Sequence, residues 1–157
     1  MNLRSHLLWS FVATLVLTSL HAASQGLGLT RMNMPYLLGT LFTPDRDRAK
    51  VVGTGLHLVA GWVFALLYVA VFHALGDATV MRGMLVGGVH AAFVLLVGLP
   101  LLPAVHPRMA SEEQGPTVVR QLEPPGFLGL HYGARTPLAV LLSHLCFGAI
   151  LGAFYQG

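Results

Sequence analysis

The sequence predicts an all-α membrane protein whose four transmembrane helices form two helical hairpins in tandem. Only 10% of the 157 residues are charged while 55% are hydrophobic, and the mean hydropathy is +0.70. Soluble domains are far more polar than this. All charged residues lie outside four runs of sequence, which are residues 5–30, 51–76, 83–107 and 136–157. Each run is long enough to cross the hydrocarbon core of a bilayer, which needs about 20 helical residues.

The segments between these runs are too short for a separate soluble domain. Residues 31–50 and 108–135 form two connections of moderate length, and residues 77–82 form a tight one. We therefore expect residues 1–157 to form a single membrane domain.

The first apolar run has some features of a secretory signal peptide. It follows Arg4 and contains a pair of small residues near its end. Cleavage after Ala23, however, would place His21 at a position where a small residue is required. The run is therefore predicted to be a retained helix.

The basic residues predict the orientation of the chain. Two of the nine, Arg4 and Arg82, fall on one side of the predicted membrane. The other seven lie on the two longer connections: Arg31, Arg46, Arg48, Lys50, Arg108, Arg120 and Arg135. Because positive residues favour the cytoplasmic side, we expect the two longer connections to lie in the cytoplasm and both termini outside. The net charge of +3 then reflects orientation, and no nucleic-acid partner is predicted.

A repeated pattern links the second and fourth runs. The segment "HLVAGWVFALLY" recurs 87 residues later as "HLCFGAILGAFY". At about 100° per residue, offsets of 0, 4, 8 and 11 share one helix face. The residues on this face are His57, Gly61, Ala65 and Tyr68 in the first copy and His144, Gly148, Gly152 and Tyr155 in the second. Small residues spaced by four let membrane helices approach closely, so the face is predicted to be a helix contact.

The first and third runs show a weaker form of the same repeat. "LHAA" at residues 20–23 aligns with "VHAA" at residues 89–92, which places His21 opposite His90. The small residues Thr14, Thr18 and Ala22 align with Gly83, Gly87 and Ala91. We therefore predict two hairpins, residues 5–76 and 83–157, related by a pseudo-two-fold axis along the membrane normal.

Two apolar segments in the connections are too short to span a bilayer. They are "MPYLLGTLF" at residues 34–42 and "PPGFLGLHYG" at residues 124–133. Each is predicted to be either interfacial or re-entrant, and the sequence does not decide between the two. Counted from the cytoplasmic charges, His57, His144 and His21 lie seven, nine and ten residues into their helices. His90 lies 18 residues from Arg108 and is expected to be deeper, unless Pro100 and Pro103 end its helix early.

The histidines inside the predicted spans are the candidate functional residues, because ionisable groups in a membrane are costly. His21, His57, His90 and His144 are candidate ligand-binding residues, together with Tyr68 and Tyr155. Neutral imidazole binds zinc, copper and haem iron, so His57 and His144 are also candidate ligands for a haem or a metal ion. Two other interpretations stay open: interhelical hydrogen bonds alone, or an aqueous or proton path. His106 and His131 lie in connections and are predicted to be solvated.

The sequence contains none of the common catalytic motifs. H-E-x-x-H, G-x-S-x-G, G-x-G-x-x-G, C-x-x-C and a Walker lysine are all absent. No Asp or Glu lies in any predicted span, which argues against a typical proton-coupled carrier. We therefore expect a protein that is not an enzyme.

The segment "RMNMPYLLGTLFTPDR", residues 31–46, precedes a helix with H-L-x-x-G and a terminal tyrosine. In this it resembles small bacterial inner-membrane proteins of unknown function, broadly YagU-like. The resemblance implies a four-helix membrane fold and a bacterial source, and it supplies no catalytic residues. The leading hypothesis is an accessory subunit of a larger membrane complex or a homo-oligomer. The alternatives are a haem- or metal-binding membrane protein and a small transporter or channel.

Overall fold

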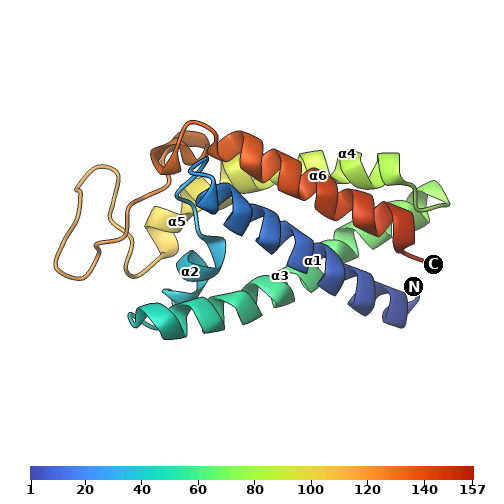
Figure 1. Ribbon diagram of the computed structural model, residues 1–157, viewed down its shortest axis with the longest axis horizontal. Coiled ribbons are helices and arrows are strands. Elements are labelled where there is room, and N and C mark those ends of the chain that lie inside the picture. Colours follow the sequence, from blue (N-terminus) through green and yellow to red (C-terminus); the bar gives the residue numbers. More distant parts are fainter.

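The computed structural model describes residues 1–157 and contains helices, turns and loops but no β-sheet. The all-α fold class is confirmed. In chain order the elements are α1 (Leu3–Gly26), α2 (Met34–Gly39), α3 (Arg46–Leu75), α4 (Val80–Phe93), the π-helical turn η1 (Val94–Gly98), α5 (Leu99–Val105), the 3-10 segment η2 (Phe127–Tyr132) and α6 (Thr136–Phe154) (Figure 1).

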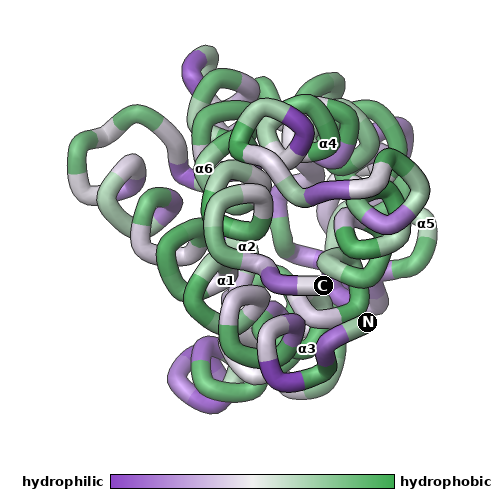
Figure 2. The backbone as a smooth tube through the Cα atoms, turned by 90° about the vertical axis from the view of Figure 1, so that its right-hand side faces the viewer, coloured by the Kyte–Doolittle hydropathy of each residue, from purple (hydrophilic) through white to green (hydrophobic).

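Four of the helical stretches are long and apolar enough to cross a membrane. They are α1, α3, α6 and the continuous stretch Val80–Val105 that joins α4, η1 and α5. Along the tube in Figure 2 most residues of these helices are hydrophobic. The chain is therefore a multi-pass membrane protein. The helix α3 begins five residues before its charge-free run, because Asp45 caps it by accepting a hydrogen bond from the Arg48 amide at 2.8 Å.

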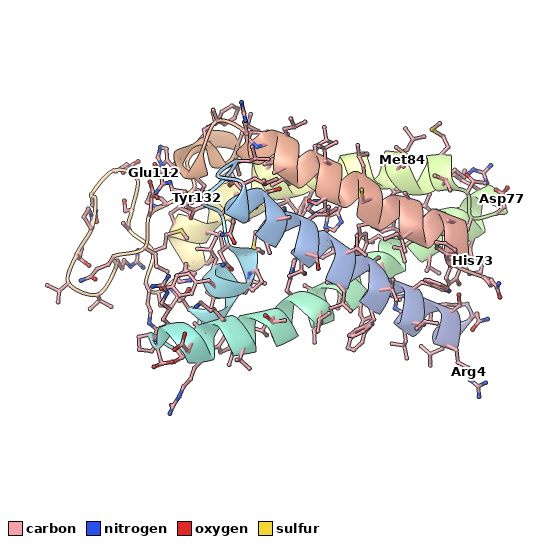
Figure 3. The ribbon with its side chains drawn as sticks, in the orientation of Figure 1. Arg4, His73, Asp77, Met84, Glu112 and Tyr132 are labelled. Carbon is pink, nitrogen blue, oxygen red and sulfur yellow. The ribbon has the colours of Figure 1, made fainter.

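The two chain termini lie at the same end of the bundle (Figure 1). The Gln156 amide donates to Ser5 Oγ at 2.8 Å and so ties them together. Arg4 and Asp77 lie at this end, whereas Glu112 lies at the opposite end (Figure 3). The chain thus crosses the bundle an even number of times, and both longer connections share the far end.

The third helix does not end early at its prolines. It runs through Pro100 and Pro103 to Val105. The turn directly before Pro100 is π-helical, and the Leu99 amide donates to the Val94 carbonyl five residues back. A wider turn relieves the clash that a proline ring makes with the preceding helical turn, and the helix therefore continues.

Close helix contacts depend on the predicted small residues. A Cβ added at Gly83 or Gly148 would overlap the other residue's carbonyl oxygen, so α4 and α6 touch backbone to backbone. Gly87 meets the His144 carbonyl in the same way. Two further contacts pair Gly152 with the carbonyl of Thr79 and Gly61 of α3 with the Thr14 side chain of α1. Ala65 lies fully buried one turn beyond Gly61. Such contacts replace the hydrophobic effect as the cause of helix association in lipid.

The helix α3 packs mainly on α1 and α2 and meets α4 and α6 over only short stretches. It diverges from α6 toward the end of the molecule that carries α2 and α5 (Figure 1). The short helix α2 fits against α3 because Gly53 lies on the Pro35 carbonyl and Gly39 on the Ala49 carbonyl. Segment 34–42 thus contains α2, and segment 124–133 contains η2. Their interfacial or re-entrant position stays a prediction, as does the tandem repeat.

Candidate functional site

Four of the histidines in the spanning helices line one cavity of about 220 Å³. Each comes from a different spanning helix: His21 from α1, His57 from α3, His90 from α4 and His144 from α6. The remaining wall is mostly apolar and includes Leu17, Met32, Met34, Phe64, Leu99 and Phe147. Polar groups are therefore concentrated in the imidazole rings.

The rings of His90 and His21 both lie close to the ring of His144. The ring centroids of His90 and His144 are 4.6 Å apart with the planes at 83°, and those of His21 and His144 are 6.4 Å apart. No group of three or more His, Cys, Asp or Glu side chains is placed to hold a metal ion. The candidate metal ligands His57 and His144 thus share the cavity without forming such a set.

His90 lies beside His144, whereas the count of residues from the cytoplasmic charges places it deeper in the membrane. Counted from the opposite end, His90 lies 11 residues after Thr79, and His144 lies 11 residues before Tyr155. At about 1.5 Å per residue this gives both histidines the same depth. The helices reach different distances at the connection end, and for that reason the count from Arg108 placed His90 too deep.

The hydrogen bond of His144 fixes which of its ring nitrogens carries a proton. His144 Nδ1 lies 2.8 Å from the Val140 carbonyl oxygen of its own helix. A carbonyl only accepts, so Nδ1 is the donor and Nε2 keeps a lone pair. This Nε2 has no hydrogen-bond partner within the chain.

His57 is fixed in the same way by a threonine. Its Nδ1 lies 3.1 Å from Thr18 Oγ1, and that hydroxyl donates its single proton to the Thr14 carbonyl at 2.7 Å. Thr18 must then accept from His57 Nδ1, which leaves Nε2 of His57 with a lone pair.

His21 has the least satisfied ring of the four. Its Nε2 lies 3.1 Å from Ser143 Oγ, which donates to the Val140 carbonyl at 3.0 Å. Nε2 is therefore the donor, and Nδ1 keeps the lone pair. His21 is only 4% exposed, and its Nδ1 is buried without any hydrogen-bond partner.

The candidate tyrosines have different surroundings. The Tyr68 hydroxyl is hydrogen-bonded to His90 Nδ1 at 3.1 Å, next to the cavity. The Tyr155 hydroxyl is hydrogen-bonded instead to Nε2 of His73, at the end of the bundle that carries the termini. Tyr155 therefore does not contribute to the cavity. Thr18 and Ser143, which orient His57 and His21, were not among the predicted site residues, although Thr18 lies one helical turn before His21 on the same face.

The prediction that His106 is solvated is wrong, because this side chain is 0% exposed. Its Nε2 lies 3.0 Å from the Leu37 carbonyl oxygen and 3.2 Å from Thr40 Oγ1. Its Nδ1 accepts from the Arg108 amide at 3.1 Å. Burial lowers the pKa of His106 below its ordinary value, against the opposing effect of the hydrogen bond to Leu37. His131, in contrast, is exposed as predicted.

A second polar cluster joins the two connections at the same end. Arg31 makes two hydrogen bonds to the Glu123 carboxylate, at 2.8 and 2.9 Å, and a further one to the His131 carbonyl. The carboxylate raises the pKa of the Arg31 guanidinium, and burial raises the pKa of the Tyr132 hydroxyl, which donates to the Glu123 carbonyl. All of these groups have partners, so the cluster links the two connections structurally.

No protein-family model, curated protein or solved structure matches this chain. Function is therefore argued from the cavity and its histidines.

Proposed function

We propose that this chain is a non-enzymatic integral membrane protein that binds a small molecule in the histidine-lined cavity. The observation that carries the proposal is the cavity lined by four imidazoles, in which Nε2 of His57 and Nε2 of His144 have no hydrogen-bond partner within the chain. Leaving a buried polar atom unpaired costs about 1–3 kcal/mol. A ligand that supplies the missing hydrogen bond recovers this free energy.

The surroundings of the cavity favour binding over catalysis. No Asp or Glu lies in the spans to orient a histidine base. The Ser143 hydroxyl lies 3.1 Å from His21 Nε2, but it accepts a hydrogen bond from that nitrogen and donates its own proton to the Val140 carbonyl. His21 in this state cannot act as a general base toward Ser143.

A haem between the histidines is a poorer fit than a small molecule. His21 and His144 belong to α1 and α6, and these helices are in direct contact through the hydrogen bond between Ser143 and His21. A macrocycle held between the two rings would have to separate the helices. A haem held between His21 and His144 is therefore not favoured by this geometry.

The location and assembly of the protein form part of the same proposal. The seven-to-two split of basic residues supports a cytoplasmic position for the connections, with both termini outside. The resemblance of residues 31–46 to bacterial inner-membrane proteins supports that membrane as the location. Within it, the protein would act as an accessory subunit or a homo-oligomer, with the cavity as its binding site.

A cavity-filling substitution tests the proposal. Benzene occupies apolar protein cavities of about 150 Å³, so it is a suitable probe for this one. We expect benzene to raise the melting temperature of the wild-type protein in detergent, because a ligand that binds only the folded state stabilises it. The substitution Ala60→Trp places a large side chain at the cavity wall and should abolish the increase.

The substitution Ala70→Trp is the matched control, because Ala70 lies on the same helix and is exposed on its outer surface. It should leave the response to benzene intact. An equal response of wild-type protein and Ala60→Trp would show that the cavity is not a binding site.

A further inference from the structure

The hydrogen bonds around the cavity determine what kind of polar group its ligand must carry. His21 Nδ1, His57 Nε2 and His144 Nε2 each keep a lone pair, because the other nitrogen of each ring donates to an oxygen. These atoms can accept a hydrogen bond but cannot donate one. A ligand that only accepts, such as a ketone, an ester or an oxidised quinone, would leave them unpaired. The complementary ligand is a hydrogen-bond donor.

The volume and walls of the cavity limit the size of that ligand. About 150 Å³ is enough for benzene, so 220 Å³ holds one substituted ring but not a fused-ring cofactor. Aromatic side chains lie beside the histidines: the Phe64 and His90 ring centroids are 4.4 Å apart, and those of Phe147 and His90 are 6.2 Å apart. Such walls favour an aromatic ligand, since rings at these separations attract one another.

The cavity opens toward lipid between α3 and α4. Its lining residues from α1 and α6, among them Leu17 and Phe147, are buried. Its lining residues from α3 and α4 are partly exposed, and Phe93 is 46% exposed. The two helices touch only briefly, and α3 diverges toward the α2 end (Figure 1). A ligand can therefore enter from the bilayer, and an apolar tail can remain in lipid.

A divalent metal ion is a weaker candidate for the same lone pairs. No three ligating side chains are suitably placed, and no carboxylate or thiolate lies at the cavity to neutralise the charge. Burying an uncompensated divalent charge among apolar groups is strongly unfavourable.

We propose that the cavity binds a single-ring phenol or hydroquinone with an apolar tail, whose hydroxyl group donates a hydrogen bond to His144 Nε2. This inference rests on the proposed function, because it names the ligand class of the same cavity. The ring lies against Phe64 and Phe147, and the tail leaves the cavity between α3 and α4.

Two ligands that differ only in the donor test the inference. The probes are 4-hexylphenol and its methyl ether, 4-hexylanisole, measured by calorimetry on the full chain in lipid nanodiscs with empty nanodiscs subtracted. We expect the phenol to bind at least about tenfold more tightly than the ether, as a hydrogen bond to a buried, otherwise unpaired acceptor should give. His144→Leu should reduce the affinity for the phenol to that for the ether. His73→Leu, which removes a histidine of α3 outside the cavity, should retain the difference.

A spectroscopic measurement on the wild-type protein covers the case in which His144→Leu does not fold. In protein with ¹⁵N-labelled histidine, His144 Nε2 should give the signal of an unprotonated imidazole nitrogen and should shift when the phenol is added but not when the ether is added. A protonated Nε2 of His144 in the unliganded protein would overturn the inference.

The outcomes separate this inference from the proposed function on which it rests. If phenol and ether bind equally and Ala60→Trp blocks both, the cavity is a ligand site with no need for a donor, water satisfies His144, and only the inference fails. If neither probe nor benzene binds, both fail. If the His144 signal shifts with Cu(I) or Zn²⁺ and not with the phenol, the ligand is a metal ion and the inference is wrong.

Discussion

The backbone contact between α4 and α6 makes a sharp prediction for Gly148→Ala. A methyl group at this position would overlap the Gly83 carbonyl oxygen, and a backbone atom within a helix cannot turn aside as a side chain can. The helices would have to separate, and forced overpacking of this kind costs about 1–3 kcal/mol. This cost exceeds the roughly 0.5–1 kcal/mol that alanine gains over glycine inside a helix. We therefore expect Gly148→Ala to lower the stability of the protein.

A matched control lies on α4 itself. At Gly88 the nearest atom to an added Cβ is a methyl carbon of Leu145 at 3.9 Å, which is an ordinary contact. Gly88→Ala should therefore be neutral or stabilising by up to about 1 kcal/mol. Gly61→Ala should fall between the two, because the methyl group there meets the Thr14 side chain, which can rotate only by losing its hydrogen bond to the Ser10 carbonyl. Equilibrium unfolding in detergent micelles, followed by circular dichroism, measures all three. Equal stability of Gly148→Ala and Gly88→Ala would refute the reasoning.

Two further predictions concern pH and topology. Because burial holds the pKa of His106 below its ordinary value of about 6.5, its contribution to stability should be complete above that pH and be lost as the pH falls below it. Histidine titrates in roughly the range from pH 7 to pH 5. Over this range the melting temperature of the wild-type protein should fall more steeply than that of His106→Gln. An equal fall in both proteins would contradict the role given to His106. For topology, a phosphatase fused after Gly157 should be active and a fluorescent protein fused there should be dark, because the C-terminus is predicted to lie outside. An inactive phosphatase together with a bright fluorescent protein would show that the C-terminus lies in the cytoplasm.

The spans and the helix contacts could be predicted from the sequence because both depend on local pattern. Charge-free runs of sufficient length determine the spans. Small residues at offsets of four determine where helices approach, and Gly148 makes such a contact in the structure. The histidine face was predictable for the same reason, since His57 and Gly61 share a face by helical geometry alone.

The features that the sequence did not predict depend on tertiary packing. His106 follows a helix end and has the composition of a solvated loop around it, but α2 folds back and covers it with Leu37 and Thr40. The persistence of the helix through Pro100 depends on the π-helical turn before it, and no residue type marks such a turn in advance. The hydrogen bond between Ser143 and His21 joins residues 122 positions apart, so no local periodicity reveals it.

A comparison of the two predicted hairpins explains why the cavity lies where it does. The repeat aligns Thr14 with Gly83 and Gly61 with Gly148, so the contact of Thr14 with Gly61 in the first hairpin corresponds to the contact of Gly83 with Gly148 in the second. In the second hairpin two glycines meet, and α4 and α6 pack closely along their length. In the first hairpin the Thr14 side chain takes the place of a glycine, so α3 stays further from α1 and diverges from the rest of the bundle (Figure 1). The space left between α3 and α4 is the cavity. Thr18 of α1 also lies between α1 and α3, where it orients His57. Replacing Thr14 by glycine should therefore let α3 approach α1 and reduce the binding of benzene, whereas unchanged binding by Thr14→Gly would show that the cavity has another origin.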